Sequence, residues 1–394
     1  MFRTVTCLLF GLSSAKVYFS ETFDDGWESR WILSKWKESE GAQGTWRAAT
    51  GKWFRDERED TGLQTVEDGK HFGISATFDP FTNEGKELII QYQIKYENDL
   101  ECGGGYIKVG PSGQNLTHFG EDTVYNIMFG PDQCGNKRRT HLIFNYKGKN
   151  HLKRDTMSFK QFTTLSHLNR LVLKPDNTVA VSVDGVEMFK GAMDKYWDLL
   201  PPREITDPHD VKPDDWVDKA MMDDPTSTKP ADWVEEAKIV DPKAQKPDNW
   251  DEEEDGLWES PIIDNPAYRG EWRAKKIVNS KFVGAWQPQI IANPDYAEDD
   301  TMYRYFDFGY VGFDLLQVKA GSIIDNIIIT DDVAEADAFA KKWEALFAAE
   351  KQQKAKEKQE AADAKQKKED MEAQLKAEEM TRADQEVAGA KVEL

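Results

Sequence analysis

The phrase KPDDW begins at Lys212 and returns as KPADW at Lys229 and as KPDNW at Lys246, so successive copies start 17 residues apart. The same interval separates three Asp-Pro pairs, three apolar residues and three tryptophans: Asp207, Asp224 and Asp241; Ile205, Met222 and Ile239; Trp216, Trp233 and Trp250. Short proline-rich units with one tryptophan each cannot build a core alone. They are stable only when they bury their apolar side against neighbouring units.

A second series of three repeats follows with a period of 14 residues. Its recurring positions are Gly256, Gly270 and Gly284; Trp258, Trp272 and Trp286; Ile263, Ile277 and Ile291; Asn265, Asn279 and Asn293; and Tyr268, Phe282 and Tyr296. Because each series contains three repeats, the simplest geometry is a long hairpin that turns in the acidic tract at 251–256. Prolines would keep its backbone extended, and paired tryptophans would clip the two legs together. We therefore predict that residues 203–300 form an extended hairpin arm.

Short alternating runs lie on both sides of this arm in the sequence. KELIIQYQIKY from Lys86, HLIFNYKG from His141 and RLVLKPDNTVAVSVDG from Arg170 are typical of an all-β sandwich or barrel. After the arm, FDLLQVKAG from Phe313 and SIIDNIIIT from Ser322 are too short to form a sheet alone, so we expect them to complete the earlier one. The β domain thus comprises residues 16–202 and 301–330, with the arm as an insertion.

Residues 331–394 are rich in Ala, Glu, Lys and Gln and almost lack Gly and Pro. This composition predicts one long exposed helix to about Ala377, followed by a frayed tail. Phe339, Trp343 and Phe347 lie on one face of its first turns, and we expect that face to dock on the β domain.

Both ends of the chain carry compartment signals. MFRTVTCLLFGLSSA has the basic, apolar and small-residue order of a secretory signal peptide over residues 1–15, the alternative being an N-terminal strand. Its removal leaves Cys102 and Cys134, and an even pair in an oxidising compartment favours a disulfide. The terminal KVEL is one residue from the KDEL retrieval signal, so we expect residence in the endoplasmic reticulum lumen. Asn115 begins an Asn-Leu-Thr glycosylation acceptor reachable there.

The charge distribution limits the partners. The formal net charge is −21, and residues 201–300 carry 25 acidic against 12 basic residues, a net of −13. A nucleic-acid partner is not expected because a polyanion repels such a surface. No apolar stretch reaches the roughly 18–20 residues of a membrane helix, so the protein is not expected to span a membrane. Calcium or a basic protein partner suits the acidic segment, which otherwise serves only solubility.

Both repeat series, in this order and number, resemble the arm of the calreticulin/calnexin family of lectin chaperones. Further similar segments are GLQT at Gly62, CGGGYIKV at Cys102, YNIMFGPDQCG at Tyr125, IFNYKGKN at Ile143, PDNT at Pro175 and DNPAYRGEW at Asp264. The resemblance implies a mainly β fold: a legume-lectin-like (jelly-roll) β-sandwich with an inserted proline-rich hairpin arm and a C-terminal α-helix. It also implies a calcium-binding, monomeric chaperone that binds monoglucosylated N-glycans on unfolded glycoproteins.

The resemblance places the sugar-contacting positions at Tyr106, Lys108, Tyr125, Met128, Asp132 and Asp314. Their chemistry suits a sugar, because aspartates accept hydroxyl hydrogen bonds, lysine donates them, and tyrosine rings cover apolar C–H faces. The family disulfide matches Cys102 and Cys134. However, Leu316 stands where calreticulins carry a tryptophan, which implies a weakened affinity. The alternative is therefore a calcium-handling or scaffold protein with a weakened lectin site.

The resemblance also implies a structural calcium ion. Asp325 matches the side-chain ligand, and backbone carbonyls near Thr22, Glu59 and Thr61 match the others; such hard oxygen ligands suit Ca²⁺. The six histidines show no zinc-ligand spacing. Residues 331–394 carry 17 acidic and 12 basic residues, a net of only −5, so a calcium-storing acidic tail is not expected.

The predicted arm tip combines Glu253, Asp255 and Trp258. An exposed aromatic ringed by acidic groups is typical of an anchor for a basic surface. The resemblance implies that the partner is a thiol oxidoreductase related to protein disulfide isomerase.

A secreted sugar-binding sandwich could also be a glycoside hydrolase. With 72 acidic residues, however, carboxylate pairs at any spacing arise by chance. The sequence contains no nucleophile elbow, phosphate loop or Cys-x-x-Cys pair. We therefore predict that the protein is not an enzyme.

Overall fold

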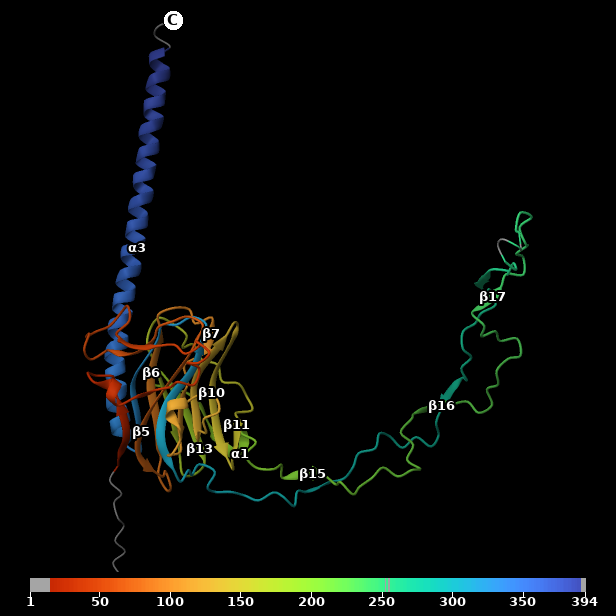
Figure 1. The fold of residues 1–394 in the computed structure, drawn as a ribbon, viewed down its shortest axis with the longest axis horizontal. Coiled ribbons are helices and arrows are strands. Elements are labelled where there is room, and N and C mark those ends of the chain that lie inside the picture. Colours follow the sequence, from red (N-terminus) through yellow and green to blue (C-terminus); the bar gives the residue numbers. More distant parts are fainter. Residues whose placement is uncertain (1–14, 252, 254–255, 391–394) are drawn as a thin grey trace, which may run out of the picture. The chain divides into compact units, whose positions relative to one another are not determined.

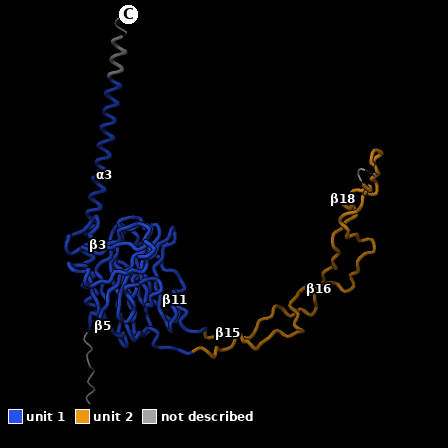
Figure 2. Tube along the Cα trace, in the orientation of Figure 1, with its two compact units in different colours: residues 1–201, 297–394 blue, residues 202–296 orange. Residues whose placement is uncertain are grey.

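The computed structural model describes residues 15–251, 253 and 256–390, with the side chains of 382–390 left out. Residues 1–14 of the predicted signal peptide, Glu252, Glu254 and Asp255 of the predicted arm turn, and the terminal KVEL lie outside the described residues. The chain divides into two units, residues 1–201 with 297–394 and residues 202–296 (Figure 2).

The first unit contains two eight-stranded antiparallel sheets that form a sandwich (Figure 1). Sheet A has the order β14 (Val186–Ala192), β13 (Thr178–Val183), β12 (His167–Leu173), β6 (Leu88–Tyr96), β22 (Ser322–Thr330), β4 (Gly62–Thr65) and β3 (Trp46–Ala49), with β1 (Val17–Glu21) also paired to β22. Sheet B has the order β11 (Lys149–Leu152), β10 (Lys137–Tyr146), β9 (Ile127–Cys134), β7 (Cys102–Gly104), β21 (Phe308–Gln317), β5 (Lys70–Phe81) and β2 (Ile32–Leu33), with β8 (Ile107–Gly110) paired to β21 and β9. The predicted sandwich is confirmed.

The two strands that follow the arm in the sequence lie inside the sheets. β22 pairs with β6 on one side and with β4 and β1 on the other, while β21 lies between β5 and the strands β7 and β8. These segments were expected to complete a single earlier sheet; in the structure one of them enters each sheet, β22 in sheet A and β21 in sheet B. Short helices η1 (Trp27–Ser29), η2 (Leu116–His118) and α1 (Met193–Tyr196) occupy connections.

Strand β6 is buried along its whole length. Its residues Leu88, Ile90, Tyr92 and Ile94 pack in the core between the sheets. Alternate side chains of a strand point to opposite faces, so Gln91 and Lys95 face outward. They are nevertheless buried, because the helix α3 (Val333–Ala390) covers that face of sheet A.

Helix α3 is held on sheet A by polar contacts that cross the interface. The Lys95 ammonium and the Glu350 carboxylate lie 3.0 Å apart, and both side chains are buried. The backbone N–H and the hydroxyl of Ser166 donate to the same carboxylate at 2.7 and 2.8 Å. Trp343 donates its indole N–H to the Ser166 carbonyl at 3.1 Å. Glu350 thus has a positive partner and two further donors, which a buried carboxylate requires.

The docking face differs in part from the predicted one. Trp343 is buried as expected, whereas Phe339 and Phe347 are only partly buried, and Phe347 stacks on Trp343 with ring centroids 5.2 Å apart. Ala336 and Leu346 take the buried positions beside Trp343. The buried face of the helix is therefore rotated relative to the predicted one, and it is the face that also places Glu350 beside Lys95.

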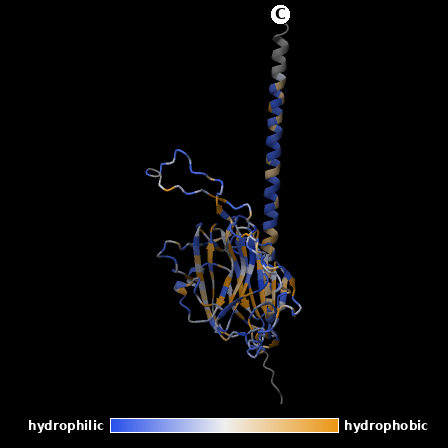
Figure 3. Cartoon of the chain, turned by 90° about the vertical axis from the view of Figure 1, so that its right-hand side faces the viewer, coloured by the Kyte–Doolittle hydropathy of each residue, from blue (hydrophilic) through white to orange (hydrophobic). Residues whose placement is uncertain are grey.

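The helix also extends beyond the predicted end at Ala377 and continues to Ala390. It begins after Asp332, whose carboxylate accepts a hydrogen bond from the Ala334 N–H at 2.8 Å and so caps the first turn. Once a helix is nucleated, each further helix-forming residue adds a hydrogen bond. No Gly or Pro stands near residue 377 to end the helix there. Figure 3 shows that most of this helix is hydrophilic.

The second unit is a ladder of three short antiparallel strand pairs. They are β15 (Glu204–Thr206) with β20 (Ile290–Ala292), β16 (Met221–Asp223) with β19 (Lys276–Val278), and β17 (Lys238–Val240) with β18 (Ile262–Asp264). The central residues of these pairs are the repeated apolar positions: Ile205 opposite Ile291, Met222 opposite Ile277, and Ile239 opposite Ile263. The two repeat series therefore pair as the legs of a hairpin.

The KPxxW phrase forms a turn that fixes a cross-leg contact. The N–H of each phrase tryptophan donates to the proline carbonyl three residues earlier at 3.0 Å: Trp216 to Pro213, Trp233 to Pro230 and Trp250 to Pro247. The indole N–H then donates at 2.8 to 2.9 Å to a repeated glycine: Trp216 to Gly284, Trp233 to Gly270 and Trp250 to Gly256. The clip predicted as a pair of rings is found at Trp216 and Trp286, 4.9 Å apart. The feature common to all three levels is instead the indole–carbonyl hydrogen bond.

The Lys95–Glu350 pair generates a stability prediction. Glu350→Ala is expected to lower the free energy of unfolding by about 3–5 kcal/mol, because Lys95 would stay buried without its counter-charge. The measurement is urea denaturation followed by tryptophan fluorescence. The control is Glu357→Ala, whose pair with Lys52 is half exposed and is expected to contribute less than about 1 kcal/mol. An equal loss for both variants would contradict the assignment.

Candidate functional site

A cavity of about 430 Å³ lies on the face of sheet B that points away from the core. Its lining residues are Trp36, His71, Tyr106, Lys108, Glu121, Tyr125, Met128, Asn150, Asp314 and Leu316. Strand alternation explains this set. Ile107, Ile127 and Phe313 pack in the core, so their neighbours Lys108, Met128 and Asp314 face the cavity. Five of the six predicted sugar-contacting residues therefore line one cavity.

A buried ion pair forms the polar centre of this cavity. The Lys108 ammonium lies 3.0 Å from Oδ2 of Asp314, and both side chains are largely buried. Lys108 also donates to the Gly120 carbonyl at 3.3 Å and lies 5.2 Å from the centre of the Tyr125 ring. Oδ1 of Asp314 receives no hydrogen bond from another described residue. The pair thus presents a fixed charge, a donor and a free acceptor in a shielded site.

Two tyrosines complete the cavity as neutral donors. Burial raises the pKa of Tyr106, and the nearby carboxylates Asp314 and Asp132 raise it further. Burial also raises the pKa of Tyr125. The Tyr106 ring lies so close to Gly104 that a Cβ there would come within 2.3 Å of it. Glycine at 104 is therefore needed for this ring position.

Asp132, the sixth predicted residue, lies on β9 next to the cavity and is not among its lining residues. It accepts a hydrogen bond from Arg139 Nε at 2.8 Å, and His141 Nε2 lies 3.3 Å away. Burial alone would raise the pKa of Asp132, but the contacts with His141 and Arg139 outweigh it and hold that pKa below its usual value. His141 in turn meets the Tyr106 ring edge-on at 5.9 Å. Asp132 therefore supports the cavity wall through these contacts.

The predicted disulfide between Cys102 and Cys134 is confirmed. The two cysteines face each other across β7 and β9, two residues from the Gly104–Asp132 pair. The bond therefore ties together the two strands that carry the Tyr106 side of the cavity.

A second site surrounds the irregularity of β22 that follows Asp325. Asp325 is 1% exposed, and burial raises the pKa of its carboxyl well above the usual value. Gln93 Nε2 donates to its Oδ2 at 3.1 Å, whereas its Oδ1 and the side-chain oxygen of Asn326 are buried without a hydrogen-bond partner. A buried carboxylate without a cation and two orphan oxygens are the features that a bound cation would satisfy.

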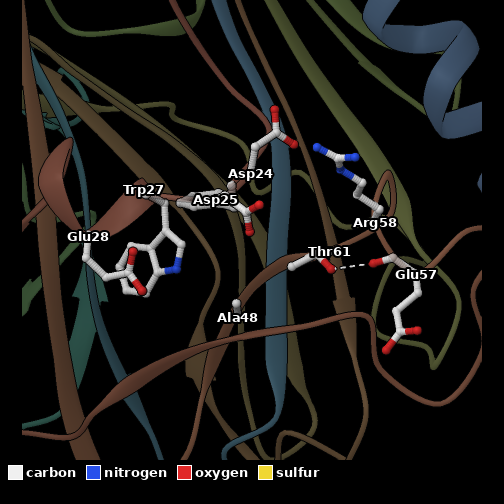
Figure 4. A pocket seen from close by; sticks show the side chains of 10 residues that line it. Asp24, Asp25, Trp27, Glu28, Ala48, Glu57, Arg58 and Thr61 are labelled. Atoms are coloured by element: carbon white, nitrogen blue, oxygen red, sulfur yellow. Dashed lines mark hydrogen bonds between the residues drawn. The ribbon is translucent and has the colours of Figure 1, made fainter.

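The other predicted calcium residues lie around the same irregularity. Thr22 follows β1, whose last residue pairs with Ile327, and Thr61 precedes Gly62, where a Cβ would come within 2.9 Å of the Asp325 Cβ. Thr61 donates to the Glu57 carbonyl at 2.6 Å (Figure 4). The side chain of Glu59 is exposed and pairs with Arg55. Only a backbone oxygen of Glu59 is therefore suited to face inward.

An acidic cavity of about 300 Å³ adjoins this region. Asp24, Asp25, Glu28 and Glu57 line it together with Thr61, as Figure 4 shows. In the described part of the chain, no three His, Cys, Asp or Glu side chains are grouped to hold a metal. A cation at Asp325 would therefore depend on one carboxylate, an amide oxygen and backbone carbonyls, which is a donor set for calcium rather than zinc.

Comparison with known proteins decides the family. The model of the calreticulin family matches residues 19–257 and 254–329. The chain belongs to the calreticulin family. Members of this family are non-enzymatic chaperones, so the hydrolase alternative is excluded.

Several calreticulins are similar over most of their length. Calreticulin of Chlamydomonas reinhardtii is 50% identical over 334 residues, covering 83% of this chain and 79% of that protein. The Caenorhabditis elegans calreticulin is 49% identical over 355 residues, covering 89% of each. Among solved structures, the T. cruzi calreticulin globular domain matches with a TM-score of 0.62 at 28% identity, covering 87% of this chain and all of that one.

Four cavity residues were not identified from the sequence. They are Trp36, His71, Glu121 and Asn150. Trp36 lies in the loop after β2 and Glu121 in the loop after η2, where no periodic pattern marks a side-chain direction. His71 is the second residue of β5 and Asn150 lies on β11, so their approach follows from the strand order of sheet B. The strand order, and not a sequence motif, brings His71 and Asn150 to the same cavity as the residues predicted from the family resemblance.

The remaining predicted sites lie on the surface. Asn115 is exposed before η2, and the Thr117 hydroxyl of its acceptor motif donates to its side-chain oxygen at 2.7 Å. At the arm tip, Trp258 is partly buried, which corrects the expectation of an exposed ring. The neighbouring Leu257 is instead 84% exposed. Asp255 lies outside the described residues, and Glu253 is exposed.

No helix in the described part of this calreticulin-family chain is both long and apolar enough to cross a membrane.

Proposed function

We propose that this calreticulin-family protein is a lectin chaperone of the endoplasmic reticulum lumen that binds monoglucosylated N-glycans on unfolded glycoproteins. The buried Lys108–Asp314 pair in the sheet B cavity carries this proposal. A free carboxylate oxygen, an ammonium and two tyrosine hydroxyls offer both acceptors and donors to sugar hydroxyls. Tyr106, Tyr125 and Met128 supply apolar surface for the C–H face of a hexose.

The ion pair would also let the cavity discriminate between hydroxylated and apolar ligands. Its groups are already desolvated and held in place, so a hexose hydroxyl that reaches Asp314 replaces little ordered solvent. A ligand lacking that hydroxyl would leave a buried acceptor unpaired, which costs about 1–3 kcal/mol. The cavity therefore favours a polyhydroxylated ligand over an apolar one of similar size.

We further propose that calcium occupies the site around Asp325. The family binds calcium. Asp325 and Asn326 would supply side-chain oxygens, and the backbone near Thr22, Glu59 and Thr61 would supply carbonyls. Bound calcium would neutralise the buried carboxylate and fasten β22 to the β1 and β4 ends of sheet A. Its role here is structural stabilisation.

The tip of the hairpin arm is proposed to recruit a thiol oxidoreductase related to protein disulfide isomerase. The observation behind it is the apolar pair Leu257 and Trp258, one exposed and one partly buried, beside the exposed acid Glu253. An apolar anchor next to negative charge complements a basic surface with a hydrophobic pocket.

The glycan proposal is tested with Asp314→Ala. We expect loss of measurable binding to a monoglucosylated high-mannose oligosaccharide by calorimetry, because the variant removes the central acceptor and leaves Lys108 unpaired. Asp122→Ala, which changes an exposed carboxylate near the cavity, is the control and is expected to bind like wild type. Absence of heat with the wild-type protein at millimolar glycan would reject the lectin function and favour a calcium-handling or scaffold role.

The calcium proposal is tested with Asp325→Asn. In chelator at neutral pH, this variant is expected to melt at or above the wild-type temperature, because it removes a buried unpaired negative charge. Added calcium should then raise the melting temperature of wild type and leave the variant unchanged. Asp79→Asn, on an exposed position, serves as the control and should respond like wild type. A calcium response in Asp325→Asn equal to that of wild type would show that the site is misassigned.

The arm proposal is tested with Trp258→Ala and Leu257→Ser. Each is expected to weaken binding of the oxidoreductase by about 30-fold or more, the effect of removing an interface anchor worth about 2 kcal/mol. Val211→Ala, which changes another highly exposed apolar residue of the same unit, should bind like wild type. If all three variants bind alike in calorimetry, the tip is not the anchor.

A further inference from the structure

The sugar cavity contains an aromatic pair that lies beside the position where calreticulins carry a tryptophan. Leu316 occupies that position and is 45% exposed. Its cross-strand partner is His71 on the neighbouring strand β5. Directly opposed residues of antiparallel strands have Cβ atoms about 4.5–5.5 Å apart, so a change at one alters the surroundings of the other.

Trp36 packs on this histidine. The two rings meet edge-to-face, with centroids 5.4 Å apart and an interplanar angle of 89°. Trp36, His71 and Leu316 all line the same cavity as Lys108 and Asp314. A bulky ring is therefore present on the Leu316 side of the ion pair, although it comes from a different segment of the chain.

The position of Trp36 is fixed by its surroundings. Its backbone N–H donates to the Ser34 hydroxyl at 3.1 Å, and that hydroxyl donates to the Phe119 carbonyl at 2.7 Å. Gly120 lies against the indole so closely that a Cβ would come within 2.3 Å of it. The loop that carries Trp36 is thus tied to the loop whose Gly120 carbonyl accepts from Lys108.

The indole keeps a free polar group. Trp36 is only partly buried, and its indole N–H, unlike its backbone N–H, donates to no other residue in the described part of the chain. A tryptophan combines apolar area with one donor, a combination that suits a sugar and that Leu316 lacks.

Resting on the proposed glycan function, we propose that Trp36, backed by His71, is the sugar-binding aromatic wall that compensates for Leu316. The wall contacts the bound hexose opposite the tyrosines and offers its N–H to a ring or hydroxyl oxygen. Affinity is consequently retained without a tryptophan at 316.

The test is a double-mutant cycle measured by calorimetry with a monoglucosylated high-mannose oligosaccharide. Trp36→Ala is expected to weaken binding about 10-fold. Leu316→Trp should change affinity less than about 3-fold in the wild-type background but should restore most of the loss in the Trp36→Ala background, because either ring fills the same space. Additive effects of the two substitutions would overturn the proposal.

Two further variants separate contact from structure. Trp36→Phe keeps a ring and is expected to bind more tightly than Trp36→Ala at equal melting temperature; equal weakening would contradict an aromatic wall. Trp53→Ala, which removes a partly exposed tryptophan that contacts α3 instead of the cavity, should bind like wild type. Addition of glycan should change the tryptophan fluorescence of wild type by more than that of Trp36→Phe.

The outcomes distinguish the two proposals. No binding by wild type rejects the glycan function itself. Normal binding by wild type together with unchanged affinity in Trp36→Ala leaves that function intact and rejects the aromatic wall.

Discussion

The fold depends on the central positions of β21 and β22. These strands follow the arm in the sequence, yet one lies inside sheet B and the other inside sheet A. Without them, β5 loses its long partner in sheet B and β6 is separated from β4 and β3 in sheet A, so the strands encoded before the arm cannot form two continuous sheets. This constraint explains why the arm is an insertion, and why Lys108 and Asp314, some 200 residues apart, can share one cavity.

Two buried ion pairs also join the segments that precede and follow the arm in the sequence. Lys95 of β6 pairs with Glu350 of α3, and Lys108 of β8 pairs with Asp314 of β21. Each pair joins a cation encoded before the arm to an anion encoded after it. Removing one partner of a buried ion pair strongly destabilises the folded state. These contacts therefore define a single register for the residues that follow the arm. Asp325 departs from the pattern, since its charge is buried without a cationic side chain.

The sequence was sufficient for much of this organisation, and its failures have physical causes. The two repeat series predicted a hairpin because three units in each leg can pair level by level, and the structure pairs the repeated apolar positions in this way, such as Ile205 with Ile291. Family resemblance located Lys108 and Asp314, and strand alternation explains why both face the cavity. Trp36 and Asn150 were not found, because their approach to the cavity depends on strand order and loop path. Helix α3 was predicted too short, since Ala, Glu and Lys propagate a helix past any local decline in apolar pattern.

The interior placement of β21 and β22 also sets an order of events during synthesis. A ribosome that has released the first 200 residues has produced strands whose central neighbours do not yet exist, and nearly 100 residues of arm must emerge before they do. Contacts of such long sequence separation form slowly, because the closure entropy must be overcome first. At about 5–20 residues per second, synthesis of the arm takes roughly 5–20 s, and during this time the nascent chain exposes unpaired edges of strands that become internal. During its own synthesis, this member of a chaperone family therefore exposes the same kind of surface as the unfolded proteins that chaperones bind.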